Sequence, residues 1–196
     1  TCPALLEADL AFIIVHGGEG EDGTLQAFLE IMDIPYTGSD MRTCALTWDK
    51  EVTRRLLAEG GVPVAEGVYL PPRPAAALND TAAIHDRVMA ACGYPVIVKP
   101  PMQGSTIGIS KVDDRAGLAP AVAAAAQFGG GVLIERFIPG HELTVAVLDG
   151  EAFPVTEIEA DTDVHCVVLQ AAGRAFSAGQ DLDERAPILA GTPIDL

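Results

Sequence analysis

The sequence predicts an α/β unit followed by an α+β region that contains an antiparallel sheet. Residues 11–15 (AFIIV) are a short apolar run, followed by a glycine cluster and then by apolar residues at helical spacing within 25–32. A strand, a glycine loop and a helix in this order are typical of an α/β unit. Asp149-Gly150 lies between two apolar runs, and this dipeptide is a strong signal for a β-hairpin. The second region is therefore expected to contain antiparallel strands.

Helices are expected where apolar residues recur every three or four positions. These segments are 25–32, about 43–58, 81–92 and 116–127. Gly60 and Gly61 end the second helix and Gly93 ends the third, because glycine readily adopts the left-handed conformation that follows a helix. Prolines within 70–74 predict a stiff connector, since proline donates no ladder hydrogen bond.

Strands are expected where short apolar runs are bounded by turn residues. They are 11–15, 96–99, 107–112, 132–135, 143–148, 152–159 and 164–170. A loop at 100–106 connects the strand that ends at Lys99 to the next one. No internal repeat is present in the sequence.

The charge balance argues against two classes of partner. Acidic residues outnumber basic residues 28 to 12, for a formal net charge of −16. A nucleic-acid-binding protein needs a basic face against the phosphate backbone, so no nucleic-acid partner is expected. The same charge disfavours binding to an anionic membrane surface. No apolar run is long enough to span a bilayer and no signal peptide opens the chain, so a cytoplasmic location is expected.

The cysteines are expected to be free thiols. Cys2, Cys44, Cys92 and Cys166 lie far apart and form no C-x-x-C pair, which favours small buried side chains over zinc ligands or disulfides. The chain begins at Thr1 in the middle of a pattern, so a preceding segment is expected to be missing.

Three segments contain residues that could carry chemistry. The first is HGGEGEDG at 16–23, where glycines allow close approach of a ligand and the helix that follows offers free N–H groups to an anion. Such strand-to-helix turns are often only tight turns, and the residues alone favour that reading.

The second candidate is Lys99, which ends an apolar strand and precedes the small-residue loop GSTIG at 104–108. A buried strand has little reason to end in lysine unless its ammonium group meets an anion or reaches solvent. The loop offers N–H and hydroxyl donors to phosphate oxygens. The alternative is a lysine that extends to solvent beside a flexible hairpin loop, and the residues leave both readings open.

The third candidate is a pair of carboxylates, Glu135 and Glu142, with apolar Phe137 and Ile138 between them. This arrangement suits a purine nucleoside, which needs apolar faces for its base and an acid for its ribose hydroxyls. The alternative is a solvated turn with two surface glutamates, and spacing alone favours the turn.

Taken together and in order, the segments resemble the D-alanine–D-alanine ligase family of ATP-grasp enzymes. The matching segments are HGGEGEDG at 16–23, PYTGS at 35–39, DK at 49–50, YPVIVKP through ISKV at 94–112, and GHELTVAVL at 140–148. The likeness covers about residues 11–160, and five motifs in family order are hard to attribute to coincidence.

The resemblance implies a fold and a domain order. It implies a partial Rossmann-like unit at 1–42 ahead of an incomplete ATP-grasp portion at 43–160, whose small lobe has an antiparallel sheet. Residues 161–196 form a separate tail in this interpretation.

The resemblance also implies a binding site for ATP. In this family's pattern, Lys50 and Lys99 contact the phosphates, Glu135 and Ile138 frame the adenine, and Glu142 holds the ribose. Cations beside the phosphates offset the charge that develops in phosphoryl transfer.

Two further positions are implied to be catalytic. Ser105 lies in the loop that closes over the γ-phosphate and the substrate, and His16 lies beside the bound amino acid. In the family, ATP phosphorylates the carboxylate of one D-alanine, and the amine of a second attacks the acyl phosphate to give the dipeptide of cell-wall peptidoglycan. Mg²⁺ offsets the phosphate charge, Mn²⁺ is a possible replacement, and the family enzymes are homodimers.

The sequence departs from the family pattern in several places. Thr106 replaces a usual serine and Arg54 a usual lysine, and both keep the functional chemistry. A glutamate that helps to hold the first D-alanine has no counterpart. The carboxy-terminal half, with its arginine, aspartate, glutamate and asparagine, is absent, so no metal ligand is assigned and no turnover by this chain alone is expected. The residues that select D-alanine, D-serine or D-lactate as second substrate would also lie there.

The tail resembles a different family. VVLQAAGRAFSAGQDL at 167–182 is similar to a segment of the crotonase (enoyl-CoA hydratase) family, and the likeness covers about 161–185. In that family the backbone N–H at the position of Ala178 forms half of an oxyanion hole. We therefore expect a junction near Asp161. The alternatives to a truncated ligase are a crotonase-family fragment that acts on CoA thioesters and a chimera without function.

Overall fold

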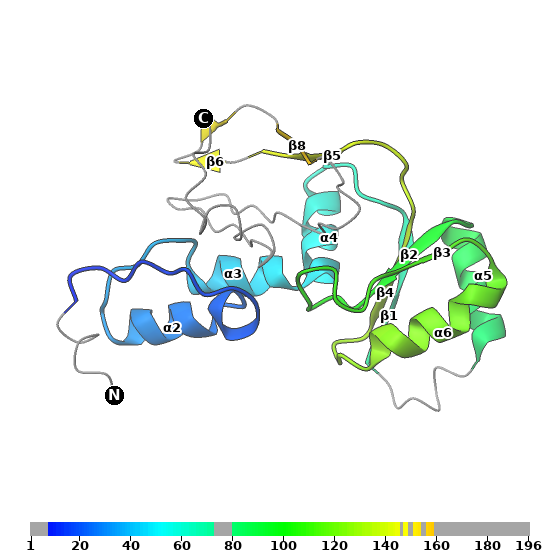
Figure 1. Cartoon of the computed structure of the whole chain (residues 1–196), viewed down its shortest axis with the longest axis horizontal. Helices are drawn as coiled ribbons and strands as arrows, with labels where there is room; N and C mark the ends of the chain where they lie inside the picture. Colours follow the sequence, from blue (N-terminus) through cyan, green and yellow to red (C-terminus); the bar gives the residue numbers. More distant parts are fainter. Residues whose placement is uncertain (1–7, 73–79, 146, 149–150, 154–155, 159–196) are drawn as a thin grey trace, which may run out of the picture. The chain divides into compact units, whose positions relative to one another are not determined.

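The structure is a computed structural model that describes residues 8–72, 80–145, 147–148, 151–153 and 156–158. The chain divides into two compact units, one formed by Thr1–Leu46 with His141–Leu196 and the other by Thr47–Gly140. Figure 1 shows the helices and strands of both units along the chain.

The central unit, Thr47–Gly140, contains a four-stranded antiparallel sheet with strand order β1-β4-β2-β3. Its strands are β1 (Gly67–Leu70), β2 (Val96–Lys99), β3 (Ser110–Val112) and β4 (Val132–Arg136). Strand β4 pairs with β1 on one side and with β2 on the other. Short apolar runs rich in valine and isoleucine favour these strands, because branched side chains pack well on a pleated surface.

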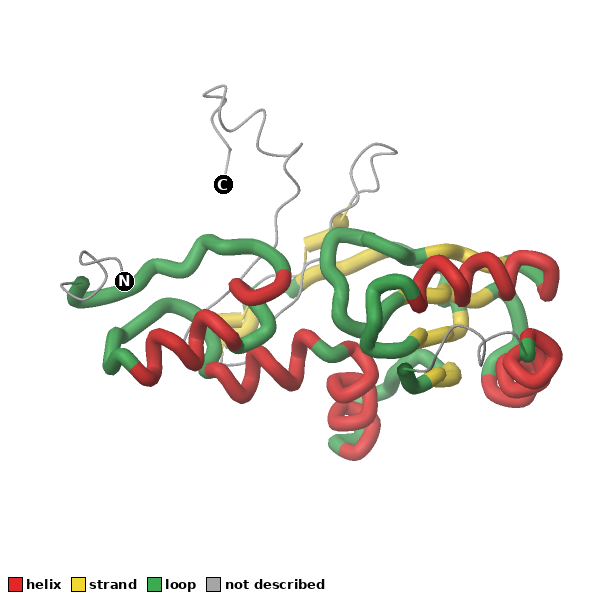
Figure 2. Tube along the Cα trace, turned by 90° about the horizontal axis from the view of Figure 1, so that it is seen from below, coloured by secondary structure: helices red, strands yellow, loops and turns green. Residues whose placement is uncertain are grey.

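Helices α5 (Thr81–Ala91) and α6 (Arg115–Ala126) pack against this sheet and against each other (Figure 1). The helices contribute the buried side chains Ile84, Val88, Leu118 and Val122 to the core, and Figure 2 shows both helices beside the strands. Each fully buried side chain of this size contributes about 1.5–3 kcal/mol to stability. The helices thus cover the side of the sheet that holds the hydrophobic core.

The opposite side of the sheet carries the remaining strand side chains. Val96 and Val98 of β2 belong to the core, so the alternation of a strand turns Ile97 and Lys99 the other way. By the same alternation, Glu135 of β4 lies on this second side. Polar and charged groups are therefore placed on the side of the sheet that α5 and α6 leave uncovered.

The other unit contains a 3₁₀ helix (Gly18–Gly20), α2 (Thr24–Ile31) and α3 (Met41–Trp48), whose last residues pass into the central unit. Two short antiparallel pairs follow later in the chain. They are β5 (Glu142–Thr144) with β8 (Thr156–Ile158) and β6 (Val147–Leu148) with β7 (Glu151–Ala152). The predicted hairpin is confirmed by these pairings, although its Asp149-Gly150 turn lies outside the described residues.

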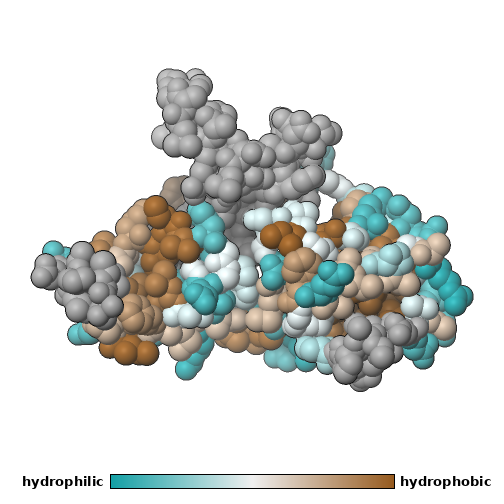
Figure 3. All heavy atoms as spheres, turned by 60° about the horizontal axis from the view of Figure 1, so that its bottom comes forward, coloured by the Kyte–Doolittle hydropathy of each residue, from teal (hydrophilic) through white to brown (hydrophobic). Residues whose placement is uncertain are grey.

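The buried strand predicted at 11–15 is wrong. Ala11 makes a single parallel bridge to Tyr36, and the side chains of Phe12 and Ile14 are exposed. A strand is buried on both sides only when neighbouring strands and helices cover it, and among the described residues one bridge is its only pairing. Figure 3 shows apolar surface on this unit.

The single helix predicted at 43–58 is two helices, α3 and α4 (Lys50–Glu59). Asp49 between them has an extended backbone, and its carboxylate accepts hydrogen bonds from the backbone N–H groups of Glu51 and Val52. This is an N-cap, which satisfies donors that the first turn of a helix leaves free. The helix therefore restarts at Lys50.

Two further differences concern strands. The strand predicted at 107–112 begins only at Ser110, because turns at Ile107 and Ile109 and a left-handed Gly108 (φ 72°) precede it. The sequence also did not predict β1, which pairs with β4 from Gly67 onward. A Cβ at Gly67 would overlap the carbonyl oxygen of Ile134, so glycine allows the two backbones to approach.

Among the described residues no helix combines the length and the apolar character needed to cross a membrane.

Candidate functional site

Lys99 and Glu135 meet on the side of the sheet that α5 and α6 leave uncovered. Lys99 lies opposite Leu133 and Glu135 lies opposite Ile97, which makes the two charged residues diagonal neighbours on β2 and β4. Lys99 Nζ is 2.5 Å from Glu135 Oε2, and the two side chains are 21% and 12% exposed. A cation and an anion are thus held in contact but remain reachable from solvent.

Lys50 holds the segment that follows β2. Its backbone N–H donates to the carbonyl oxygen of Pro101 at 3.1 Å, and its ammonium group donates to the carbonyl of Gln103 at 2.5 Å and of Pro101 at 3.5 Å. Asp49 fixes the start of α4 and therefore the position from which the Lys50 side chain extends. The amino end of α4 and the loop after β2 are joined by these bonds.

The loop between β2 and β3 contains unusual backbone conformations. Ser105 and Thr106 both have positive φ values, 49° and 61°, within a turn closed by a 3.1 Å bond from Ile107 N–H to Gly104 O. Such values are uncommon for residues with a side chain, and most of all for a β-branched residue such as Thr106. Strained backbone of this kind persists where the surroundings hold it, and it concentrates at ligand-binding segments. Ser105 is exposed at the turn.

The segment after β4 is also anchored to the sheet. Arg136 N–H donates to Glu66 O at 2.8 Å, and Phe137 N–H donates to Pro95 O at 3.0 Å. Ile138 follows with an exposed apolar side chain, which is suited to contact a flat ring. The ammonium group of Lys111 lies 4.6 Å from the centroid of the Phe137 ring.

Five of the seven predicted site residues lie in the central unit. The central unit contains Lys50, Lys99, Ser105, Glu135 and Ile138. Lys99 contacts Glu135, and Lys50 contacts the loop that carries Ser105.

The remaining two predicted residues belong to the other unit. His16 is exposed before the 3₁₀ helix, where Gly17 N–H donates to Glu21 Oε2 at 2.8 Å. Glu142 is the first residue of β5.

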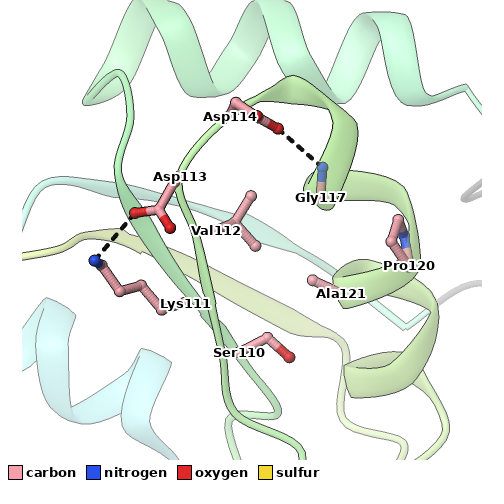
Figure 4. A pocket seen from close by; sticks show the side chains of 8 residues that line it. All are labelled: Ser110, Lys111, Val112, Asp113, Asp114, Gly117, Pro120 and Ala121. Atoms are coloured by element: carbon pink, nitrogen blue, oxygen red, sulfur yellow. Dashed lines mark hydrogen bonds and ion pairs between the residues drawn. The ribbon is translucent and has the colours of Figure 1, made fainter.

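A cavity of about 440 Å³ lies elsewhere, between β3 and the start of α6 (Figure 4). It is lined by Ser110, Lys111, Val112, Asp113, Asp114, Gly117, Pro120 and Ala121. Lys111 is paired with Asp113 at 3.0 Å, and Asp114 caps α6 by accepting hydrogen bonds from Ala116 and Gly117. None of the predicted site residues lines this cavity, and its acidic groups do not suit a polyphosphate.

The sequence did not indicate two contributors to the site region. Trp48 was expected only as part of the helix at 43–58, yet its ring centroid lies 5.8 Å from Lys50 Nζ and the tip of its ring lies beside Gly104. Glu66 pairs with Arg136 at 2.6 Å and stabilises the end of β4. The available signal for Trp48 was its position two residues before Lys50. Nothing in the local sequence indicates that Glu66 pairs with Arg136.

Cations beside a small-residue loop on an antiparallel α+β sheet define a domain suited to an anionic ligand, and comparison with known proteins identifies its family. The model of the D-alanine–D-alanine ligase carboxy-terminal domain matches residues 56–168, and the model of the amino-terminal domain matches residues 2–39. The chain belongs to the D-alanine–D-alanine ligase family. The predicted α+β fold class and family are confirmed.

Individual relatives agree with this assignment. The D-alanine–D-alanine ligase of Sodalis glossinidius is 41% identical over 144 residues, covering 74% of this chain and 38% of the relative. That of Chromohalobacter salexigens is 44% identical over 154 residues, covering 79% and 46%. The chain thus spans about half the length, or less, of the curated relatives it matches.

Solved structures give the same result. The D-alanine–D-alanine ligase of Bacillus anthracis superposes with a TM-score of 0.62 at 28% sequence identity, covering 79% of this chain and 49% of that one. A structure of that enzyme complexed with ATP gives a TM-score of 0.63 with the same identity and coverage.

The predicted junction near Asp161 was placed inside a region that the ligase model matches, since that match runs to residue 168. The crotonase-like segment predicted at about 161–185 is not shown by these comparisons. It also lies outside the described residues, as does the strand predicted at 164–170.

Proposed function

We propose that this chain is the nucleotide-binding part of an ATP-dependent ligase that joins two D-alanines for peptidoglycan synthesis. The observation that carries the proposal is the Lys99–Glu135 pair on the side of the sheet that α5 and α6 leave uncovered. Beside it in the chain, the strained loop that follows Lys99 is tied to Lys50.

The chemistry of the two lysines supports phosphate binding. Each ammonium group already contacts an oxygen, that of Glu135 for Lys99 and that of Gln103 for Lys50. Phosphate oxygens carry negative charge, so they attract an ammonium group more strongly than a neutral carbonyl such as that of Gln103 does. We assign Lys50 and Lys99 to the ATP phosphates and Ser105 to the γ-phosphate.

The end of β4 supports a site for the base. Ile138 offers an exposed apolar side chain directly after an anchored strand end, and Glu135 offers a carboxylate. We assign these two residues to the adenine and Glu142 to the ribose. His16 is assigned to the bound amino acid, with Ser105 and His16 as catalytic residues.

The reaction follows from these assignments and from family membership. The carboxylate of one D-alanine receives a phosphoryl group from ATP, and the amine of a second D-alanine displaces phosphate to form the peptide bond. We also propose the division into residues 1–42, 43–160 and 161–196, a homodimeric whole enzyme, and the cytoplasmic location expected from the sequence.

A divalent metal is part of the family's chemistry, and Mg²⁺ is the proposed ion, with Mn²⁺ as a substitute. The described residues contain no group of three or more histidine, cysteine, aspartate or glutamate side chains that could hold a metal ion. Glu135 is engaged by Lys99. The described donor set therefore does not fit a metal site, and no step is assigned to a metal held by these residues.

Calorimetric titration with ATP in the presence of Mg²⁺ tests the proposal. Wild-type protein is expected to bind, and Lys99→Ala is expected to lose measurable binding. Arg87→Ala is the matched control, because it also removes one cation but from an exposed position on α5. Absence of binding by the wild type, or equal loss in both variants, would contradict an ATP site at Lys99.

The crotonase-like tail remains a prediction from the sequence, and the family match favours the ligase. Titration with a CoA thioester separates the two. Binding of the thioester without binding of ATP would support the crotonase alternative.

A further inference from the structure

We infer that Trp48 is a positioning residue for the loop between β2 and β3, and that with Lys50 it anchors the end of this loop near Pro101–Gly104. The inference rests on the proposed function in one respect, the identification of the loop's ligand as the phosphate chain of ATP.

The first observation is the position of the Trp48 ring. The residue is 6% exposed and ends α3, one position before the N-cap of α4. A Cβ built on Gly104 would lie 3.7 Å from the tip of the ring. The ring therefore lies beside Gly104, with room for little more than one side-chain carbon between them.

The second observation is the relation of the ring to Lys50. The ammonium group lies 5.8 Å from the ring centroid, within the distance at which a cation is attracted to an aromatic face. The same ammonium group donates to Gln103 O at 2.5 Å. Trp48 thus lies beside the loop on one side and beside the cation that binds the loop on the other.

The third observation is the strained backbone of Ser105 and Thr106, which directly follow Gly104. Ser105 and Thr106 keep left-handed conformations only while both sides of the turn are fixed. On the far side, Gly108 is confined, since a Cβ there would lie 2.6 Å from the Phe128 ring. On the near side, Trp48 and Lys50 provide the contacts.

These contacts define the role of Trp48. The ring lies beside Gly104 and beside the Lys50 ammonium group, and we assign to it the placement of both. A phosphate that binds the loop therefore depends on Trp48 through the loop and through Lys50.

Hydrogen exchange measured by mass spectrometry on the full chain tests the inference without any ligand. In Trp48→Leu, amides of the loop segment 102–109 are expected to exchange about fivefold or more faster, while those of β2 and β4 keep their rates. Trp48→Phe, which keeps an aromatic ring, is expected to change the loop rates by less than about twofold. Leu56→Ala is the matched control, because it removes a half-exposed apolar side chain from α4.

Unchanged loop rates in Trp48→Leu would overturn the inference. A parallel rise in β2 and β4 would also overturn it, since Trp48 would then stabilise the whole unit and not the loop. If Trp48→Leu does not fold, Lys50→Met is measured in the same way, and faster exchange confined to the loop is again expected.

The intrinsic fluorescence of Trp48 provides a second readout, because it is the only tryptophan in the chain. Titration with ATP and Mg²⁺ is expected to shift the emission of the wild type and to leave that of Lys99→Ala unchanged. ATP binding without any shift would count against contact between the ring and the liganded loop. A wild type that binds no ATP would contradict the proposed function, whereas the exchange measurements would still decide the role of Trp48.

Discussion

Lys99 and Glu135 form an ion pair between two neighbouring strands, with 2.5 Å between Nζ and Oε2. The register of β2 and β4 places them diagonally on the side of the sheet that lacks the hydrophobic core. The two side chains are mostly buried, at 21% and 12% exposed, so removal of one partner would leave the other charge poorly compensated. The pair therefore contributes to folding as well as to the proposed ATP site.

Substitution of the pair separates these two roles. Lys99→Met and Glu135→Gln are each expected to lower the free energy of unfolding by about 1–3 kcal/mol, because each leaves a mostly buried charge without its partner. Lys99→Met is expected to weaken ATP binding at least about tenfold, since a charge-assisted contact is lost. Urea denaturation and calorimetry of the same samples provide the measurements. Unchanged ATP binding by folded Lys99→Met would assign the pair to folding alone.

Glu51 provides a contrast, because its carboxylate is buried and paired. It contacts Arg54 at 2.9 Å and Arg55 at 2.6 Å, and the two arginine side chains are 21% and 65% exposed. Arg54→Met is expected to lower the free energy of unfolding by about 1–2 kcal/mol, because it removes the less exposed partner of a buried charge. Arg55→Met is the matched control, with an expected cost below about 0.5 kcal/mol. Equal costs in urea denaturation would show that burial of the arginine has no influence.

Asp49 is expected to stabilise α4 through its capping carboxylate. Asp49→Ala should lower the free energy of unfolding by about 1 kcal/mol, whereas Asp49→Asn, which keeps an acceptor, should be nearly neutral. Thermal or urea unfolding of both variants provides the comparison. If Asp49→Asn loses as much stability as Asp49→Ala, the charge of Asp49 matters and not the hydrogen bonds that it accepts from Glu51 and Val52.

Cys44 is expected to react slowly with alkylating reagents at neutral pH. Burial and the nearby carboxylates, first that of Asp40, raise the pKa of its thiol to about 11 from the ordinary value of 9.0. The reactive species is the thiolate, so alkylation at pH 8 should be about a hundredfold slower than in urea-unfolded protein. Its rate should rise with pH up to about 11.

The same pKa shift predicts a loss of stability at alkaline pH. The folded state favours the protonated thiol, so the stability that Cys44 contributes is complete below pH 9.0 and decreases as pH rises towards about 11.

The alkylation prediction is checked by peptide mass spectrometry after timed iodoacetamide treatment, which follows Cys44 separately from the other cysteines. Equal alkylation rates in native and unfolded protein would contradict the shift.

Much of the fold was predictable because its signals are local. The periodicity at 81–92 and 116–127 predicted α5 and α6, and apolar runs predicted β2 and β4. The break between α3 and α4 was missed because Asp49 is compatible with a helical repeat until its capping bonds are seen. The strand β1 was missed because a glycine start and flanking prolines obscure its pattern, and its pairing with β4 is distant in sequence.

The site was predictable in composition but not in geometry. Lys99 and Glu135 were both identified, yet their contact depends on the register of two strands that are separated in the chain by β3 and α6. The bond from Lys50 to Gln103 likewise depends on tertiary packing. No pattern in a short window of sequence encodes either contact.

The central place of β4 has a consequence for synthesis of the protein. Both of its neighbours, β1 and β2, precede it in the chain. Until the ribosome has produced Val132–Arg136, β1 has no strand to pair with and β2 has an open edge towards the missing strand. Unpaired apolar edges of this kind promote association between chains. The nascent chain is thus most exposed to aggregation, and most in need of chaperones, in the interval before β4 emerges.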